Sequence, residues 1–200
     1  MSAEILGAMG LLDPVRSGEG KSRICIIDVE STALDADVGI FVGGGLMELD
    51  GKFSWFYSRN PREEPRALGN FLEKISGYQV VFTWNGRIFD LPFITARSIK
   101  HGLRVERLHT IIHIDLAEFV KNNLKLARND LYHVAKFLNI KKNLNIEGLD
   151  IPKLYMRAVK GDKEASLAIK RHCRDDLEVT RKVLKKLFPL VRVRHQGLRI

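Results

Sequence analysis

The sequence predicts one α/β domain: a mixed β-sheet whose first three strands are antiparallel and whose later strands are parallel, with helices on both faces. Three apolar or alternating segments between residues 23 and 57 follow one another without a helical pattern, which predicts an antiparallel meander. From residue 67 onward helical and strand patterns alternate, and a strand after a helix implies a crossover and parallel pairing. The 200 residues, 45% of them hydrophobic, suit one domain with a sizeable core.

The first predicted strand covers residues 23–29, and two carboxylates lie at its end, in Asp28-Val29-Glu30-Ser31. Alternate side chains of a strand share a face, so Asp28 and Glu30 project together while Val29 points the other way. Like charges held this close repel each other, and a bound cation or a shared proton compensates them. We therefore expect this pair to be one half of a metal site.

Residues 41–49 and 52–57 are the next two predicted strands. Asp50-Gly51 between them predicts a hairpin turn of type I′, with positive φ at both residues. Gly43-Gly44-Gly45 permits a close approach or a bulge, and without a following Lys-Ser/Thr it does not indicate a phosphate-binding loop. Trp55 and Tyr57 alternate with Phe56 and are expected to be packing residues.

The next elements place a third carboxylate beyond a central strand. Residues 67–75 have the apolar spacing of a half-buried helix, and residues 79–84 form a short apolar run typical of a buried strand. This strand ends at Asn85, and a helix begins near Pro92 and runs to about residue 102. Asp90 therefore lies where the loop becomes a helix. By itself, an aspartate in this position would be expected to cap the helix.

The second half of the chain is predicted to be mainly helical. Residues 110–115 form a short strand ending in Asp115, which we expect to be a structural hydrogen-bonding residue rather than a further ligand. Asp130 is placed to cap a helix over residues 131–138, and three lysines lie on or beside its exposed side. These lysines are Lys136, Lys141 and Lys142, and the remaining helices are predicted at residues 116–122, 153–159 and 162–187.

The last predicted helix has titratable residues in its middle. His172 and Asp176 are four residues apart and so share one face of the helix. Asp175 is rotated by about 100° from Asp176 and is expected to face solvent, with Arg174 or nearby lysines as partners. Its apolar positions are Leu167, Ile169, Leu177, Val179, Val183, Leu184 and Leu187.

Four carboxylates now stand at the end of an apolar element or on a face expected to pack on the sheet: Asp28, Glu30, Asp90 and Asp176. Hard oxygen ligands of this kind suit Mg²⁺ or Mn²⁺. A zinc site is not expected, because no cysteine or close HxxxH pattern accompanies the spaced histidines. These histidines are His101, His109 and His113.

The formal net charge of +9 is concentrated at the C-terminal end, where residues 181–200 contain seven basic residues and no acidic one. This distribution favours a polyanionic partner such as nucleic acid over a membrane surface, the alternative being a solvated helix face. The two cysteines imply no disulfide framework, so we expect a reducing, cytoplasmic environment. Residues 1–22 are expected to be an extension, without the pattern of a signal or membrane segment.

Three motifs together resemble those of the DEDD superfamily of 3′–5′ exonucleases, in the same order and at matching spacing. They are Asp28-x-Glu30-Ser31, Asn85-x-x-x-Phe89-Asp90 and His172-x-x-x-Asp176. The similarity extends over about residues 23–187. The pattern is most similar to stand-alone RNase H-like 3′–5′ exonucleases and to the proofreading domains of family B DNA polymerases.

The resemblance implies an RNase H-like domain over residues 23–188, between the extension at 1–22 and a basic tail at 189–200. It implies a two-metal phosphodiesterase in which the four carboxylates bind two Mg²⁺ or Mn²⁺ ions and Asp28 bridges both. The residues that the resemblance places against the substrate are Val29, Ser31, Asn85 and Phe89, with Trp84 as a further candidate against a base.

One position departs from the family. The polymerase-like branch has tyrosine four residues before the last aspartate, and another branch has histidine five residues before it, whereas His172 stands at the four-residue spacing. The two spacings differ by about 100° on a helix, so His172 need not reach the attacking water as either family residue does. We expect His172 to be a general base or a water-orienting group, the alternative being a packed or surface histidine without a catalytic role.

The expected function is the hydrolysis of DNA or RNA from a single-stranded 3′ end, releasing nucleoside 5′-monophosphates. Repair or replication proteins are candidate partners, and no membrane is expected. The alternative is a catalytically weak nucleic-acid-binding subunit of a repair or replication complex that keeps the exonuclease fold. A third option is an endonuclease that acts on structured or hybrid substrates.

Overall fold

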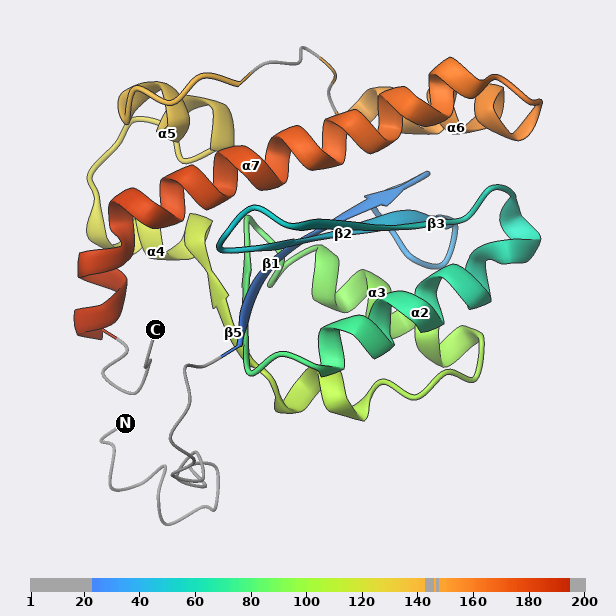
Figure 1. Ribbon diagram of the computed structural model, residues 1–200, viewed down its shortest axis with the longest axis horizontal. Coiled ribbons are helices and arrows are strands. Elements are labelled where there is room, and N and C mark those ends of the chain that lie inside the picture. Colours follow the sequence, from blue (N-terminus) through green and yellow to red (C-terminus); the bar gives the residue numbers. More distant parts are fainter. Residues whose placement is uncertain (1–22, 143–145, 147, 195–200) are drawn as a thin grey trace.

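The computed structural model describes residues 23–142, 146 and 148–194, so the predictions for residues 1–22 and 195–200 lie outside the described residues. Five strands form one sheet in the order β3-β2-β1-β4-β5 (Figure 1). β1, β2 and β3 pair antiparallel, whereas β1 pairs parallel with β4 and β4 with β5. The predicted mixed sheet is confirmed. The strands are β1 (Ile24–Ser31), β2 (Phe41–Glu48), β3 (Phe53–Tyr57), β4 (Val80–Thr83) and β5 (Ile112–Asp115).

Helices cover both faces of this sheet, as the sequence predicted (Figure 1). One face packs on α2 (Glu64–Ser76) and α3 (Asp90–Lys100). The other packs on α4 (Leu116–Asn123), α5 (Leu131–Phe137), α6 (Ile151–Val159) and α7 (Lys163–Arg194). Short 3₁₀ helices lie at η1 (Pro61–Glu63), η2 (Glu106–Thr110) and η3 (Gly148–Asp150). None of the helices in the described part of the chain has the length and apolar character needed to cross a bilayer.

Strand β1 lies at the centre of the sheet and contributes to a hydrophobic core on each of its two faces. Ile24 and Ile26 belong to the core shared with α7, whereas Cys25 and Ile27 belong to the core shared with α2. The same alternation continues to the end of the strand. The side chains of residues 28 and 30 therefore emerge on the α7 face.

The β2–β3 hairpin differs from the predicted type I′ turn. Gly51 has φ of 98°, but Asp50 is not among the residues with positive φ. The Gly51 N–H donates to the Glu48 carbonyl and the Glu48 N–H donates to the Lys52 carbonyl, both at 2.9 Å. The turn is therefore a three-residue loop that requires the left-handed conformation only of the glycine, which spares Asp50 the steric cost of positive φ.

The three glycines of β2 permit close approach, as expected, and they do so on both faces of the sheet. A Cβ on Gly44 would lie 2.6 Å from the Phe71 ring of α2. A Cβ on Gly45 would collide with Cys173 Sγ and would lie 2.6 Å from Leu177, both on α7. Because these glycines have no side chains, α2 and α7 can pack closely against the centre of the sheet.

Helix α7 is longer than predicted. It continues past Leu187 and through Pro189 to Arg194. Val191, one turn beyond Leu187, is also buried, so the core-facing stripe extends through this last part. Leu167, one of the apolar positions of the sequence pattern, is not part of the core. It is 39% exposed, since it lies off the stripe formed by the buried Ala165 and Ile169.

A buried ion pair ties the β1–β2 loop to two helices. Arg97 Nε and Nη2 donate to the two carboxylate oxygens of Glu64 at 2.7 and 2.5 Å, and Arg97 Nη1 donates to the Ala36 carbonyl at 2.9 Å. The Phe41 N–H also donates to Glu64, and a His101 ring nitrogen lies 3.0 Å from it. Burial disfavours the carboxylate, but these bonds outweigh burial and hold the pKa of Glu64 below its usual value.

Candidate metal centre

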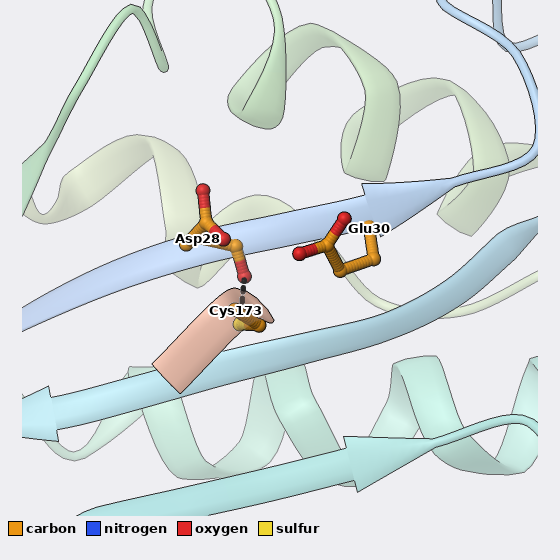
Figure 2. Close-up of side chains that lie close together, drawn as sticks. All are labelled: Asp28, Glu30 and Cys173. Atoms are coloured by element: carbon orange, nitrogen blue, oxygen red, sulfur yellow. Dashed lines mark hydrogen bonds between the residues drawn. The ribbon is translucent and has the colours of Figure 1, made fainter. Parts of the chain in front are cut away.

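Asp28 and Glu30 project from one face of β1, as predicted (Figure 2). Their partners on the neighbouring strand β2 are Gly45 and Gly43. Glu30 is 4% exposed, and among the described residues its Oε1 atom has no hydrogen-bond partner. One oxygen of each carboxylate lies with Cys173 Sγ in a group whose atoms are all within 4.8 Å of one another. A buried carboxylate oxygen without a donor is costly, and it is a ready ligand for a hard cation.

Cys173 contacts Asp28 at both its backbone and its side chain. Its thiol donates to the Asp28 carbonyl oxygen at 3.9 Å, which is the dashed line in Figure 2. Burial first, and then the charges of Asp28 and Glu30, raise the pKa of the thiol well above its usual value. A neutral thiol is a poor ligand for Mg²⁺ or Mn²⁺. Cys173 is therefore a packing residue that anchors α7 beside Asp28.

Asp90 is the first residue of α3 and is 3% exposed. The helix has Phe89 at its N-cap and no side-chain cap, so Asp90 is not the helix cap that its position alone would predict. Its Oδ1 atom is buried and has no hydrogen-bond partner among the described residues. Asp90 is thus free to contribute an oxygen to the same centre as Asp28 and Glu30.

Asp115 shapes the loop that leads to Asp90. Its Oδ1 accepts from the Asn85 N–H at 3.0 Å and its Oδ2 from the Arg87 N–H at 3.0 Å, and the side chain also caps α4 through the Ala117 N–H. With both oxygens occupied by backbone donors, Asp115 has the structural role that the sequence predicted. Asn85, held at φ of 61°, begins the turn between β4 and α3.

Burial and mutual repulsion raise the pKa values of the three carboxyl groups. Burial raises the pKa of Asp28 to about 7, with a further contribution from Asp176. The pKa values of Glu30 and Asp90 lie well above the usual range, because burial is reinforced in both by the charge of Asp28. A divalent cation bound between these carboxylates would offset both the burial of their charges and their mutual repulsion. The buried, unpartnered carboxylate oxygens therefore fit Mg²⁺ or Mn²⁺.

Asp176 and His172 come to this centre from α7. His172 is 4% exposed, and its Nε2 lies 3.7 Å from Glu30 Oε1 and 3.9 Å from Asp176 Oδ2. Burial lowers the pKa of His172 despite the opposing charge of Asp176, so the imidazole is neutral near pH 7. The structure thus brings His172 and the four predicted carboxylates together.

The prediction that Asp175 faces solvent was wrong. Its side chain is buried, and the residue is only 8% exposed. Helix α7 contacts α5 and α6 as well as β1 and β2, so more of its circumference is covered than in a helix packed on a sheet alone. The carboxylate of Asp176 keeps more contact with solvent, with a side chain 20% exposed.

Lys142 is the residue of this centre that sequence reasoning missed. Its Nζ lies 2.6 Å from Asp176 Oδ1, and both side chains are mostly buried. The charge of Lys142 also lowers the pKa of the carboxyl groups of Asp28 and Glu30, against the larger effect of burial. Lys142 was recognised only as one of several lysines near α5, since no motif marks it. Its role depends on how the chain after α5 folds back onto α7.

Replacing Lys142 with glutamine should make the centre more dependent on divalent cations. We expect the melting temperature in EDTA to fall by about 5 °C, because a charge-assisted contact of about 1.5–3 kcal/mol is lost. Added Mg²⁺ should then raise the melting temperature by more than it does in the wild type. Thermal unfolding with and without Mg²⁺ measures both effects, with Lys160→Gln on the exposed end of α6 as control. An equal response to Mg²⁺ in Lys142→Gln and wild type would contradict this role.

A cavity of about 410 Å³ adjoins Glu30. Three of the four residues predicted to contact substrate, Val29, Ser31 and Phe89, line it, whereas Asn85 does not. The Ser31 hydroxyl donates to the Ala33 carbonyl at 2.6 Å, so it is already used within the loop. Trp84 packs against the α7-side core and does not line this cavity. Leu34, Leu149 and Pro152 contribute further apolar surface to the cavity.

The three spaced histidines have separate partners. His101 contacts Glu64, His109 contacts Thr95 and His113 contacts Thr83, at 3.0, 3.2 and 2.7 Å. Each imidazole is thus part of a different local contact.

Comparisons with known proteins agree with the fold. The RNase H superfamily profile matches residues 25–188. A DNA polymerase of Methanocaldococcus jannaschii is 26% identical, over 64% of this chain and 9% of the polymerase. The family B DNA polymerase of the hyperthermophilic archaeon Pyrobaculum calidifontis has the same fold, with a TM-score of 0.72 at 19% identity over 85% of this chain and 25% of that one. The chain therefore spans a small part of either polymerase. With a matching profile over most of its length and the mixed five-stranded sheet in place, the chain belongs to the RNase H superfamily.

Proposed function

We propose that this protein is a metal-dependent 3′–5′ exonuclease that releases nucleoside 5′-monophosphates from single-stranded DNA or RNA. The observation that carries the proposal is the group of carboxylates on β1 and α3, in which buried oxygens of Glu30 and Asp90 have no hydrogen-bond partner among the described residues and Glu30 lines a cavity. Asp28, Glu30, Asp90 and Asp176 would hold two Mg²⁺ or Mn²⁺ ions. Ions held there would activate the attacking water and stabilise the departing 3′ oxygen.

The cavity beside Glu30 would receive the 3′-terminal nucleotide. Its walls are formed by the end of β1, the following loop, Phe89, Leu149 and Pro152. Apolar walls of this kind can hold a base or sugar without reading its identity, which suits an enzyme that removes successive nucleotides. Asn85 would act from the adjacent loop, where Asp115 fixes its backbone.

The similarity to archaeal DNA polymerases supports a role in nucleic-acid processing and makes replication or repair proteins the partners to test first. The alignment covers only 9% of the Methanocaldococcus jannaschii polymerase, so synthesis is not proposed for this chain.

We assign His172 the role of general base or water-orienting group. Its ring is neutral, and Nδ1 is buried without a hydrogen-bond partner among the described residues. His172→Phe keeps a planar ring in this space and removes both nitrogens, so we expect kcat to fall by about 10²–10⁴-fold. His172→Tyr restores the residue of the polymerase-like branch and should retain more activity than His172→Phe. Single-turnover rates measure this difference. A rate for His172→Phe within threefold of wild type would leave His172 a packing residue.

A second candidate is a nucleic-acid-binding subunit with little activity. The contact between Lys142 and Asp176 favours it, because an ammonium already neutralises one of the four carboxylates. The two candidates differ in whether Mg²⁺ or Mn²⁺ can act at this centre despite Lys142.

A cleavage assay with end-labelled single strands separates these candidates. With Mg²⁺ or Mn²⁺, an exonuclease acting from the 3′ end should release a labelled mononucleotide at once from a 3′-labelled oligonucleotide. A 5′-labelled strand should give a descending ladder, and a circular single strand should remain intact. Binding without cleavage of any substrate would support the second candidate, and nicking of the circle would support an endonuclease.

A further inference from the structure

A second concave surface, which we call the basic pocket, lies at the end of α5. It has a volume of about 600 Å³ and is lined by Tyr132, Lys136, Asn139, Ile140, Lys141 and Lys142. Three of these residues are lysines and none is acidic. Among the described residues, neither Lys136 nor Lys141 has an ion-pair partner. The pocket therefore presents positive charge in a concave site, which favours an anionic ligand.

The shape of the basic pocket is fixed by the end of α5. Asn139 has φ of 56°, a left-handed conformation typical of a residue just past a helix, and it turns the chain back toward α7. Lys186 Nζ on α7 donates to the Leu138 carbonyl at 2.7 Å and holds this turn in place. A fourth ammonium group therefore lies beside the pocket.

Tyr132 gives the basic pocket an aromatic wall. The side chain is 55% exposed, and its ring makes an edge contact with His133 at a centroid distance of 5.5 Å. His133 is held in turn by Asp130 at 2.8 Å. A supported but exposed aromatic ring beside lysines is the combination with which proteins bind single-stranded nucleic acid, with bases stacked on the ring and phosphates near the cations.

Lys142 connects the basic pocket to the carboxylates. It lines the pocket, and its ammonium contacts Asp176. Arg194, the last described basic residue of α7, is much farther away, about 27 Å from Asp176 along the helix at a rise of about 1.5 Å per residue. The basic pocket is thus nearer to the carboxylates than the last turn of α7 is.

We propose that the basic pocket binds the nucleotides immediately upstream of the 3′-terminal nucleotide of a single strand. Lys136 and Lys141 contact the phosphates, and Tyr132 stacks on a base. The inference rests on the proposed function for the position of the 3′ end. It specifies the substrate further, as a strand of several nucleotides and not a dinucleotide.

Equilibrium binding in EDTA tests the basic pocket without catalysis. A 5′-fluorescent single-stranded 12-mer is titrated with protein at several salt concentrations. Tyr132→Ala should weaken binding by about tenfold or more, and Tyr132→Phe should stay close to wild type. The double variant Lys136→Gln/Lys141→Gln should lower the slope of log K against log salt by about 1.4, since each phosphate contact in a single strand contributes about 0.7. Lys160→Gln is the matched control and should leave binding unchanged.

Photo-crosslinking of the wild-type protein gives a test that needs no variant. Oligonucleotides with 5-iodouracil at the second, third or fourth position from the 3′ end should crosslink to Tyr132. Unchanged affinity and salt slope in the variants, an equal loss in Lys160→Gln, or crosslinks confined to the end of α7 would each overturn the inference.

The outcome for the basic pocket is separable from that for the proposed function. Loss of binding in the Tyr132 and lysine variants of a protein that cleaves nothing would establish the pocket and remove the exonuclease proposal. If the protein cleaves from the 3′ end and its pocket variants bind normally, the exonuclease proposal would be supported and the role of the basic pocket would be excluded.

Discussion

Replacing Asp28 with asparagine should lower the rate of phosphodiester hydrolysis by at least about 10³-fold, which corresponds to about 4 kcal/mol of transition-state stabilisation. Asp28 lies at the centre of the carboxylate group, because its charge raises the pKa values of both Glu30 and Asp90. A neutral amide at this position would weaken the binding of the two ions that we propose for this centre. Single-turnover cleavage of an end-labelled oligonucleotide measures the loss.

When no divalent cation is present, Asp28→Asn should make the stability of the protein less sensitive to rising pH. Burial raises the pKa of Asp28 from 3.8 to about 7, so the folded protein holds this proton more tightly than the unfolded chain does. The stability that the protonated group contributes is complete below about pH 4 and is lost as the pH rises through 7. In EDTA the wild type should therefore lose stability between pH 5 and 8.

Asp28→Asn should show a smaller loss over this range, because asparagine does not titrate. Thermal unfolding in EDTA at several pH values, repeated with Mg²⁺, tests this expectation. A variant that is as pH-sensitive as the wild type, or as active, would contradict the role assigned to Asp28.

Replacing Arg97 with methionine should lower the free energy of unfolding by about 3–5 kcal/mol, because it leaves the buried Glu64 carboxylate without its main partner. For a chain of this size the melting temperature should fall by about 10 °C. Arg97→Met/Glu64→Gln removes both charges while an oxygen remains for the Phe41 N–H, so it should recover part of the loss.

The Glu64 network also has a defined pH dependence. Because the pKa of Glu64 is held below 4.5, its contribution is present above that pH and is lost as the pH falls through the folded pKa. Arg157→Met is the matched control. Arg157, which is 56% exposed, forms an ion pair with Asp162 at the surface, so this substitution should cost far less stability than Arg97→Met. A loss in Arg97→Met as small as that of the control would show that the network does not stabilise the fold.

The positions of the four carboxylates were predictable, because each follows from the side-chain periodicity of one strand or helix, or from its place at the end of a strand. Asp28 and Glu30 follow from the alternation of one strand, and Asp176 from the spacing of one helix. Asp90 was placed by the end of a buried strand. These rules act within one element, so they need no knowledge of how elements meet. The mixed sheet was predictable for the same reason, since hairpin and crossover signals are local.

The contacts between elements were not predictable in this way. Lys142 reaches Asp176 only because the chain after α5 returns to α7, and Cys173 lies beside Asp28 because β2 lets α7 approach. The burial of Asp175 depends on additional helices packing against α7. Each of these features arises from tertiary packing that leaves no periodic trace in the sequence.

Gly43 and Gly45 lie directly opposite Glu30 and Asp28, although they contain no chemical group of their own. An alanine at Gly45 would push Cys173 away from the sheet, and His172 and Asp176 would move with it. The distance between the carboxylates on β1 and the carboxylate on α7 therefore depends on how closely α7 packs on the sheet. This close packing is possible because Gly45 has no side chain. The spacing within the candidate metal centre is therefore set partly by two glycines that supply no ligand.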